Sequence, residues 1–279
     1  MKYAAEIAIA VKRNPWEGLR TALSKLSSPI HLDGTLKQIL VKPSIYDPAL
    51  PGNTSLEMTM AVARLFRHAA SISIVESDNP QRTADEAFEK MNYERLENEG
   101  FRLVNLSNLD TVLAEFAGHA FLQRQIPDIL AFNPFLVNVS TAKLQSSIKI
   151  SASIKNLFGL LPEQDKSKYH DNLSDVLLDL LTAFRPALTI VDLTKVVVGN
   201  RTDQNEVHIG GVLVGRDPVA VDAFCASLFG VEPMDVPYLR RAFEEGLGEA
   251  MLDRITVLGT EIQKVRLFEA FSEHVRIHK

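Results

Sequence analysis

The sequence predicts an α/β fold, a single domain over residues 1–279 with a mostly parallel or mixed sheet flanked by helices. Short segments rich in β-branched residues alternate along the chain with amphipathic segments of about 10 to 15 residues, which is the pattern of βαβ units. With 279 residues, 46% of them hydrophobic, the chain can bury a large core. No low-complexity or linker-like stretch in the sequence marks a second domain.

The first half of the chain alternates predicted strands with predicted helices. Pro15 suits the first turn of the first helix, and Thr54 or Ser55 can cap the second. Residues 108–126 fit neither pattern well, and we expect a hairpin excursion there. The predicted strands are 3–11, 36–41, 71–75, 101–106 and a segment within 129–139, and the predicted helices are 15–26, 54–69, 83–91 and 93–99.

The second half continues the same alternation. A strand over residues 188–191 is expected to end at Asp192. Asp217 precedes Pro218, and this pair predicts the N-cap and first position of a helix. The remaining predicted strands are 207–214 and 255–258, and the predicted helices are 172–184, 219–229, 236–245 and 263–278.

Between these halves, residues 137–162 concentrate lysine and serine side chains on a backbone that must also be buried. From Ala142 to Ile154 apolar and polar residues nearly alternate, which is typical of an extended segment with one buried face. From Ile150 onward the apolar spacing becomes helical. We therefore expect a change from strand to helix near Ser151, with Ser151 as the N-cap.

Composition narrows the classes of function. The net charge of -5 argues against a general nucleic-acid surface, although a local basic site stays compatible with it. The single cysteine, Cys225, is predicted to be a small buried residue, and one cysteine excludes intrachain disulfides and cysteine-ligated zinc or iron–sulfur clusters. The sequence lacks a signal-peptide pattern and an apolar run of about 20 residues, so we expect a cytoplasmic protein with no membrane partner.

Several polar side chains follow predicted strand ends, where ligands bind in open parallel sheets. They are Lys42, Glu76, Asp78 and Asp192. Ordinary loops also carry such residues, so each alone is a weak signal, and the four together favour a site. Their carboxylates leave a magnesium site as an alternative, whereas no histidine spacing indicates a metal centre.

A second signal is a local reversal of charge. Residues 137–170 contain five lysines against Glu163 and Asp165, so that 5 − 2 gives +3 in an otherwise acidic chain. Lys143, Lys149 and Lys155 could form a cationic row for a phosphate or carboxylate, or belong to a solvated strand face. Because Lys155 and Asn156 lie within an apolar run, the ammonium of Lys155 requires a carboxylate partner or an anionic ligand.

Two aspartates near residue 220 have different expected roles. Asp217 is better explained as a helix cap than as a catalyst. Asp222 lies within an otherwise apolar helix and therefore needs a partner, for which one of the lysines is a candidate. An ion pair of this kind would serve structure or catalysis equally well.

Several sequence strings resemble a prokaryotic family known as domain of unknown function 362. The resemblance extends from about Ile39 to Gly259, and it implies a single α/β domain that some members join to a ferredoxin-like module. The cysteines of that module are absent here, so we do not expect this chain alone to transfer electrons. The strings are ILVKPS, VESD, ASIKNLFGLLP with the following KYH, ALTIVD, and GVLVGRDPVAVDAFCASLFG followed by VPYLRRAFEEGLG.

The resemblance also implies site residues. The family's KPN lysine falls on Lys42, its KTH motif on Lys143 to Gln145, its KN pair on Lys155 and Asn156, and its paired aspartates on Asp217 and Asp222. This chain departs from the family pattern where Ser44 replaces the KPN asparagine, Gln145 replaces the KTH histidine and Val198 replaces a glutamate.

These observations predict a protein that binds a small phosphate- or carboxylate-bearing metabolite at a lysine-rich site, and that transforms it if it is an enzyme. The expected ligand-binding residues are Lys42, Lys143, Lys155, Asn156 and Asp217, and the expected catalytic residues are Lys155, Asp192 and Asp222. The alternative is a non-catalytic partner or scaffold for a redox or metal-cluster system, in which an exposed row of lysines is a docking surface.

Overall fold

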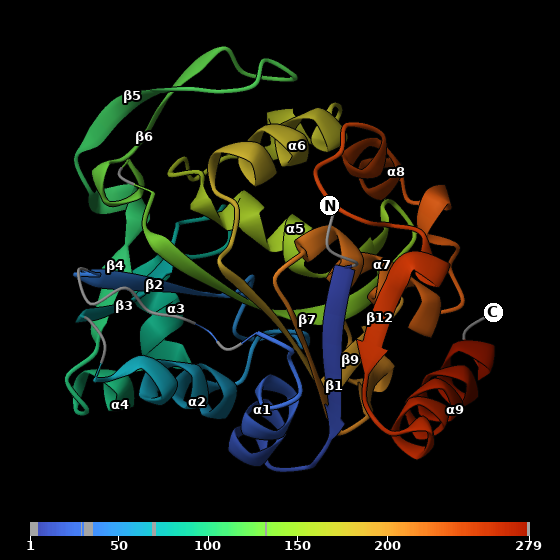
Figure 1. Cartoon of the computed structure of the whole chain (residues 1–279). Helices are drawn as coiled ribbons and strands as arrows, with labels where there is room; N and C mark the ends of the chain where they lie inside the picture. The colour runs from blue at the N-terminus through green and yellow to red at the C-terminus, as the bar shows by residue number, and fades with distance from the viewer. Residues whose placement is uncertain (1–4, 29, 31–35, 69–70, 132, 278–279) are drawn as a thin grey trace.

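A computed structural model of the chain describes residues 5–28, 30, 36–68, 71–131 and 133–277. Its centre is a ten-stranded sheet in the order β12-β1-β11-β9-β7-β2-β3-β4, with β8 paired to β7 and β10 paired to β9 (Figure 1). The strands are β1 (Ala5–Val11), β2 (Gln38–Pro43), β3 (Ser71–Glu76), β4 (Arg102–Asn105), β7 (Phe135–Gln145), β8 (Lys149–Ser151), β9 (Leu188–Val198), β10 (Glu206–His208), β11 (Gly211–Gly215) and β12 (Ile255–Leu258).

The sheet is mixed, which confirms the predicted fold class of a single α/β domain. Strands β4, β3, β2, β7 and β9 are parallel. Strand β11 runs antiparallel between β9 and β1, and β12 returns parallel to β1. The carboxyl ends of β2, β3 and β7 therefore meet at one edge, where a ligand site is expected in such folds.

Helices cover both faces of the sheet, and the alternation of side chains along the strands divides the core in two (Figure 1). Leu40 and Val191 face one cluster, whereas their neighbours Val41 and Ile190 face the other. The first cluster receives α5 (Ser153–Asn156), α6 (Leu173–Ala183), α7 (Pro218–Leu228), α8 (Pro237–Glu244) and α9 (Glu261–Ile277). The second receives α1 (Pro15–Leu23), α2 (Leu56–Phe66), α3 (Ala84–Lys90) and α4 (Glu94–Glu97).

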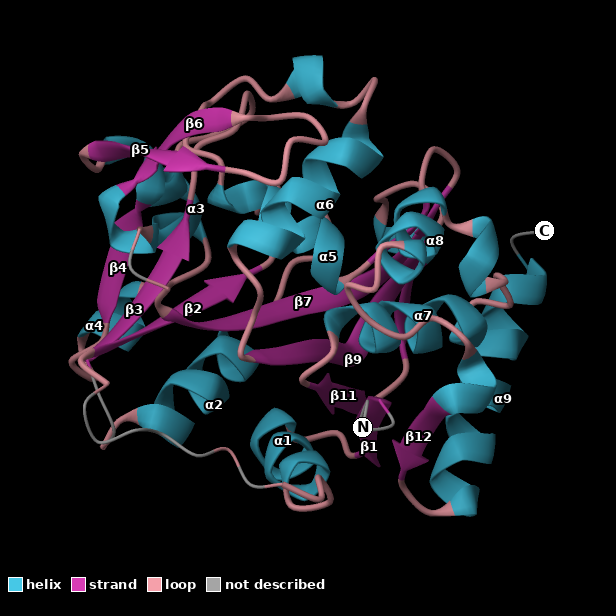
Figure 2. Ribbon diagram, turned by 45° about the horizontal axis from the view of Figure 1, so that its top comes forward, coloured by secondary structure: helices cyan, strands magenta, loops and turns pink. Residues whose placement is uncertain are grey.

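The predicted excursion at residues 108–126 is a separate two-stranded hairpin, β5 (Thr111–Glu115) and β6 (Gln123–Pro127), which extends beyond the main sheet (Figure 2). Its tip is attached to α6 by Asp179, whose carboxylate accepts hydrogen bonds from three successive backbone N–H groups, those of residues 119–121. This attachment fixes a hairpin that has no strand neighbours of its own.

Two strand predictions were wrong in extent. Strand β9 does not end at Asp192 but continues to Val198, because its β-branched second half pairs with β7 and β10. The segment predicted as one strand over residues 207–214 is two, β10 and β11, separated at Gly210 with a φ of 83°. Residues 3–4, 69 and 278, placed in predicted elements, lie outside the described residues.

Helix starts follow the predicted capping chemistry. Ser55 accepts the backbone N–H of Met58 at the start of α2, and Asp217 accepts those of Val219 and Ala220 at the start of α7. Cys225 lies buried within α7, as predicted.

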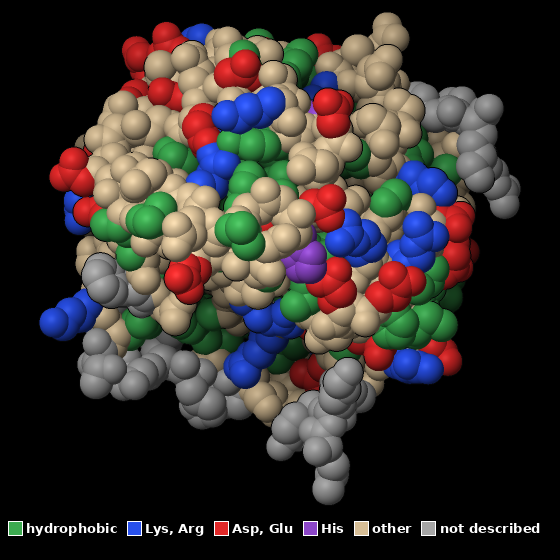
Figure 3. All heavy atoms as spheres, turned by 90° about the horizontal axis from the view of Figure 1, so that it is seen from above, with side chains coloured by type: hydrophobic (Ala, Val, Ile, Leu, Met, Phe, Trp, Pro, Cys, Tyr) green, Lys and Arg blue, Asp and Glu red, His purple; other side chains and the backbone are tan. Residues whose placement is uncertain are grey.

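None of the described helices is long and apolar enough to cross a membrane. Basic and acidic side chains are interspersed on the face shown in Figure 3.

Candidate functional site

The segment that follows β7 turns back as β8 and then enters the short helix α5. The predicted alternation and the predicted change to helix are both present, but Ser151 is not the N-cap. Ser151 ends β8, and the cap residue Ala152 has no side-chain hydrogen bond to offer. The start of α5 is capped instead from a distant part of the sequence, by Asp222 in α7.

The Asp222 carboxylate is fully buried and accepts four hydrogen bonds. Three come from Ser153, through its N–H at 2.7 Å and hydroxyl at 2.5 Å, and from the Ile154 N–H at 3.0 Å. The Tyr238 hydroxyl donates the fourth at 3.2 Å. Burial raises the pKa of Asp222 to about 6 despite these donors. None of the described lysines forms an ion pair with Asp222, in contrast to the prediction, and Asp222 acts as the anchor that positions Lys155 and Asn156.

A cavity of about 500 Å³ opens beside α5 at the carboxyl ends of β2 and β3. It is lined by the loops after β2, β3, α5 and β9 and by the turn between β7 and β8. The charged side chains in its wall are five cationic groups and two carboxylates, so that 5 − 2 gives +3 with histidine neutral. They are Lys42, Arg82, Lys155, Lys166 and Arg201, against Glu76 and Asp78.

The cavity wall contains a fully buried ion pair between Lys42 and Glu76. The Lys42 Nζ lies 2.8 Å from a Glu76 carboxylate oxygen and also donates to the Pro43 carbonyl at 2.7 Å. Gly159 passes so close that a Cβ on it would lie 2.8 Å from Nζ of Lys42 and from Oε1 of Glu76. Only glycine fits this approach without displacing the pair.

Asn156 connects α5 to this ion pair and to the sheet. Its amide group donates to the Lys42 carbonyl at 3.1 Å and to the Asn138 side chain at 2.7 Å, and its own oxygen lies 3.4 Å from the Lys42 Nζ. Asn138 in turn donates to the Ser153 carbonyl at 2.7 Å. Asn156 therefore fixes the geometry of the cavity wall through its contacts with protein groups.

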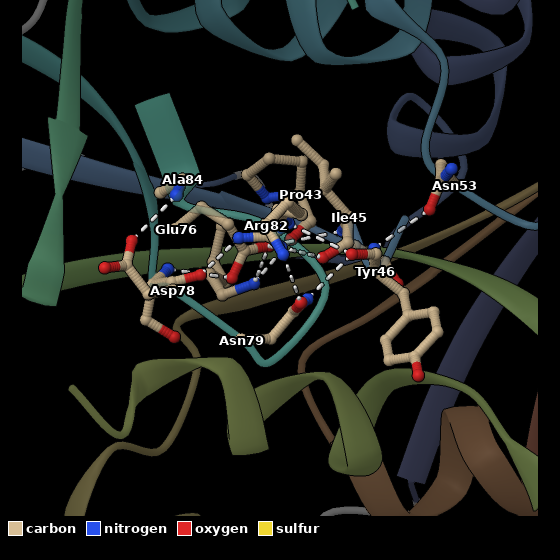
Figure 4. A network of polar contacts seen from close by, with 12 residues as sticks. Pro43, Ile45, Tyr46, Asn53, Glu76, Asp78, Asn79, Arg82 and Ala84 are labelled. Atoms are coloured by element: carbon tan, nitrogen blue, oxygen red, sulfur yellow. Dashed lines mark hydrogen bonds and ion pairs between the residues drawn. The ribbon is translucent and has the colours of Figure 1, made fainter. Parts of the chain in front are cut away.

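Arg82 holds two of the surrounding loops together, as Figure 4 shows. Its guanidinium donates to the carbonyls of Ile45, Tyr46 and Ser77 and lies 4.0 Å from Glu76. In the same view Asp78 points toward Ala84, whose N–H it accepts at 2.8 Å. The polar groups on this side of the cavity are therefore already paired.

Two other cations in the wall are not paired. The Lys155 Nζ lies 3.7 Å from the centroid of the Phe158 ring and makes no hydrogen bond or ion pair with any described residue. The Arg201 guanidinium lies 4.8 Å from the Tyr46 ring centroid, and its buried Nη1 has no hydrogen-bond partner within the described part of the chain. Burial, with Arg201 and Lys166 nearby, lowers the pKa of Lys155 to about 7.

Lys166 is intermediate between the paired and the unpaired cations in its hydrogen bonding. Its buried amine donates to the Ser77 hydroxyl at 3.2 Å and to the Asp78 carbonyl at 2.6 Å, so its partners are neutral oxygens. Burial lowers the pKa of Lys166 to about 8. The amine can still offer a third N–H to a ligand in the cavity.

The structure separates the other lysines of the predicted row. Lys143 is buried away from the cavity wall, where its amine donates to Gly52 and Thr141 oxygens at 2.6 to 3.1 Å. Lys149 is exposed and lies 3.3 Å from Asp235. Lys143, Lys149 and Lys155 therefore do not lie together in one exposed row.

Asp192 and Asp217 also lie outside the cavity wall. Alternate residues of a strand lie on the same face of the sheet, so Asp192 shares the face of Ile190 and points toward α2. There the Ser55 hydroxyl donates to it at 3.2 Å. Lys42 shares the face of Leu40, which is the opposite one. Asp217 accepts the N–H groups that start α7 and that of Glu249. Both carboxylates are therefore occupied in holding structure.

The carboxylates suggested for magnesium do not converge. Glu76 pairs with Lys42, Asp78 accepts from the start of α3 and from Asn105, and Asp192 is on the other face of the sheet. Over the residues that the structure describes, no group of three or more His, Cys, Asp or Glu side chains could hold a metal ion.

Sequence reasoning missed Arg82, Arg201, Tyr46 and Gly159. Arg201 was missed because β9 was predicted to end at Asp192. A strand that ends there does not bring residue 201 to the edge of the sheet where the cavity lies. The KNLFG string contained the signal for Gly159, because a glycine three residues after Asn156 lies on the next turn and faces the same ion pair.

Comparison with known proteins places these residues within a family. The family model described as Domain of unknown function (DUF362) matches residues 39–227, about two thirds of the chain. The chain belongs to this family. Every charged residue of the cavity wall lies inside the matched DUF362 range.

Two similar proteins add context. A thylakoid-associated protein, sll1697, from Synechocystis sp. is 24% identical over 252 residues, covering 82% of this chain and 74% of that protein. The apoprotein structure of lactate racemase from Thermoanaerobacterium thermosaccharolyticum matches with a TM-score of 0.49 at 13% identity. That match covers 81% of this chain, which spans 57% of the length of that structure.

Proposed function

We propose that this member of the DUF362 family binds a small phosphate- or carboxylate-bearing metabolite in the cavity beside α5. The observation that carries the proposal is that the Lys155 amine and the Nη1 of Arg201, which line the same cavity, have no hydrogen-bond acceptor among the described residues. A cationic group removed from water is costly unless an anion or acceptor compensates it. The missing compensation is what an anionic ligand would supply.

The chemistry of the two groups suits such a ligand. A guanidinium presents a planar set of donors that matches the two oxygens of a carboxylate or phosphate, and an ammonium adds a compact charge. Lys166 contributes a third donor from the loop after α5. A volume of about 500 Å³ is within the usual range for metabolite sites.

The remaining residues of the wall act as positioning residues in this proposal. The Lys42–Glu76 pair and Asn156 hold the wall, and Asp222 fixes the start of α5. Transformation of the ligand would need a group that can exchange a proton or attack it. Lys155, with a pKa lowered to about 7, suits that role at neutral pH.

A thermal-shift panel tests binding. Orthophosphate, pyruvate and succinate are compared at constant ionic strength, with glycerol as an uncharged control. A ligand at ten times its Kd stabilises the fold by about 1.4 kcal/mol, which raises the Tm by about 2 to 3 °C. We expect at least one anion to do so, and Lys155→Met and Arg201→Met to lose the effect.

The matched control is Lys195→Met, which removes the same charge from an exposed lysine on β9 that pairs with Glu206. This variant should keep the full ligand-dependent shift. Equal stabilisation of all three variants, or no stabilisation of the parent protein by any anion, would contradict the proposal.

A further inference from the structure

We propose that Lys155 is a nucleophile that forms an imine with an aldehyde or ketone bearing one anionic group, while Arg201 holds that group. This inference rests on the proposed function, because it uses the same cavity and assigns the anion to Arg201. It goes further by naming the reactive class of ligand and the atom that bonds to it.

The first support is the free amine. Lys42 and Lys143 each point their Nζ at three protein oxygens, and Lys166 points its Nζ at two. Lys155 makes no such bond with the described residues, although it is anchored on α5 between Asn156 and the Asp222 cap. An amine held in place without acceptors is free to use its nitrogen lone pair once it is neutral.

The second support is the balance of charge around that amine. The face of the Phe158 ring favours the charged ammonium. Burial and the positive charges of Arg201 and Lys166 oppose it, and they lower the pKa of Lys155 to about 7. Near neutral pH about half of the molecules therefore carry the nucleophilic form of the amine.

The third support is the placement of an anchor. Arg201 lines the same cavity, its Nη1 has no acceptor among the residues that the structure describes, and its guanidinium lies over the Tyr46 ring. A carboxylate or phosphate bound there leaves the rest of a small molecule inside the cavity that Lys155 also lines. This arrangement would bring a carbonyl group to the amine and replace a bimolecular encounter with an intramolecular one.

The step balances without an oxidant or reductant. The neutral Lys155 nitrogen attacks the carbonyl carbon, the C–N bond forms, and a proton passes from that nitrogen to the former carbonyl oxygen to give a neutral carbinolamine. Lys166, with a pKa of about 8, can then donate a proton to the hydroxyl group, which leaves as water. The resulting iminium nitrogen returns one proton to the neutral Lys166 amine and becomes the imine. The net change is the exchange of one carbonyl oxygen for the lysine nitrogen, with release of one water.

Reductive trapping tests this assignment on the full chain. The protein is incubated with glyoxylate, pyruvate or dihydroxyacetone phosphate, treated with sodium cyanoborohydride, and analysed by intact mass and peptide mapping. We expect one predominant adduct, on Lys155, that falls at least tenfold in Arg201→Met and persists in Lys195→Met. The carboxylate and phosphate compounds distinguish the two kinds of anionic group.

Acetone, a carbonyl compound without a charge, should label Lys155 at least tenfold less at the same concentration. Orthophosphate should protect Lys155 of the parent protein from labelling. This test uses only the parent protein, so its result does not depend on whether any variant folds. Labelling by acetone to the same extent, or labelling spread over exposed lysines, would overturn the inference.

The same data separate the two proposals. If the anionic carbonyl compounds raise the Tm through Arg201 but leave no adduct on Lys155, the imine is wrong and the binding site stands. If neither stabilisation nor an adduct is found with any compound, the binding proposal itself fails, and the imine with it.

Discussion

The charged side chains on the two sides of the cavity differ in whether they have partners in the protein. On one side Lys42 and Glu76 are buried 2.8 Å apart and surrounded by Asn156, Arg82 and Gly159. On the other, Lys155 and Arg201 face the cavity with aromatic rings beneath them and no acceptors among the described residues. A basic residue in the wall of a site therefore indicates a ligand only where the protein itself does not supply its partner.

The largest effect is expected from breaking the paired side. Lys42→Met removes the nearest cation of the buried Glu76 carboxylate and leaves only Arg82, at 4.0 Å, beside it. We expect the free energy of unfolding to fall by about 3 kcal/mol, measured by urea denaturation. Adding Glu76→Leu should recover most of that loss, because it removes the carboxylate that has lost its closest partner. A single variant as stable as the parent would mean that the pair does not hold this wall.

A smaller loss is expected at the anchor of α5. Asp222→Asn replaces one acceptor oxygen with an amide that faces the donors of Ser153 and Ile154, and we expect a loss of about 1 to 3 kcal/mol in urea denaturation. Anion binding should weaken as well, since α5 carries Lys155. Asp235→Asn, at an exposed carboxylate, is the control and should change stability by no more than about 0.5 kcal/mol.

The unpaired side should respond in the opposite way. Lys155→Met removes an ammonium that has no acceptor in the described part of the chain, so we expect the free energy of unfolding without ligand to stay within about 1 kcal/mol of the parent or to rise. Urea denaturation without anions measures this. A loss as large as that of Lys42→Met would remove the distinction between the two sides.

The affinity of the cavity for an anion should also depend on pH. The pKa values of Lys155 and Lys166 are lowered to about 7 and 8, so above these values the free protein has lost charge that an anion needs. Orthophosphate affinity should therefore fall as pH rises from 7 to 9, by up to about tenfold per pH unit for each proton taken up. Calorimetry in buffers of different ionisation enthalpy should detect this uptake, and an affinity that stays constant over the range would argue against these amines.

Local sequence patterns were enough to predict some parts of the site. The alternation through Ile150, the helical spacing after it and the apolar setting of Lys155 all depend on neighbours a few residues away. For the same reason the helix cap at Asp217 was predicted and is present. Lys42 and Glu76 were expected at strand ends, and β2 and β3 bring them together.

Other parts depend on contacts between distant segments. Asp222 appeared to need a lysine, but its partners are backbone N–H groups almost 70 residues away, which no spacing reveals. Lys143 and Asp192 lie on the face of the sheet that α2 covers. Alternation in the sequence shows which residues share a face, but it does not show which helices cover that face. Arg201 reaches the cavity only because β9 extends to Val198.

The most direct test of the account is anomalous diffraction from crystals grown with selenate, which is a tetrahedral dianion like phosphate. We expect a selenium peak inside the cavity, within hydrogen-bonding distance of the Arg201 guanidinium and the Lys155 amine, and its loss in Arg201→Met crystals. Selenium peaks only at exposed lysines such as Lys195, with none in the cavity, would contradict it.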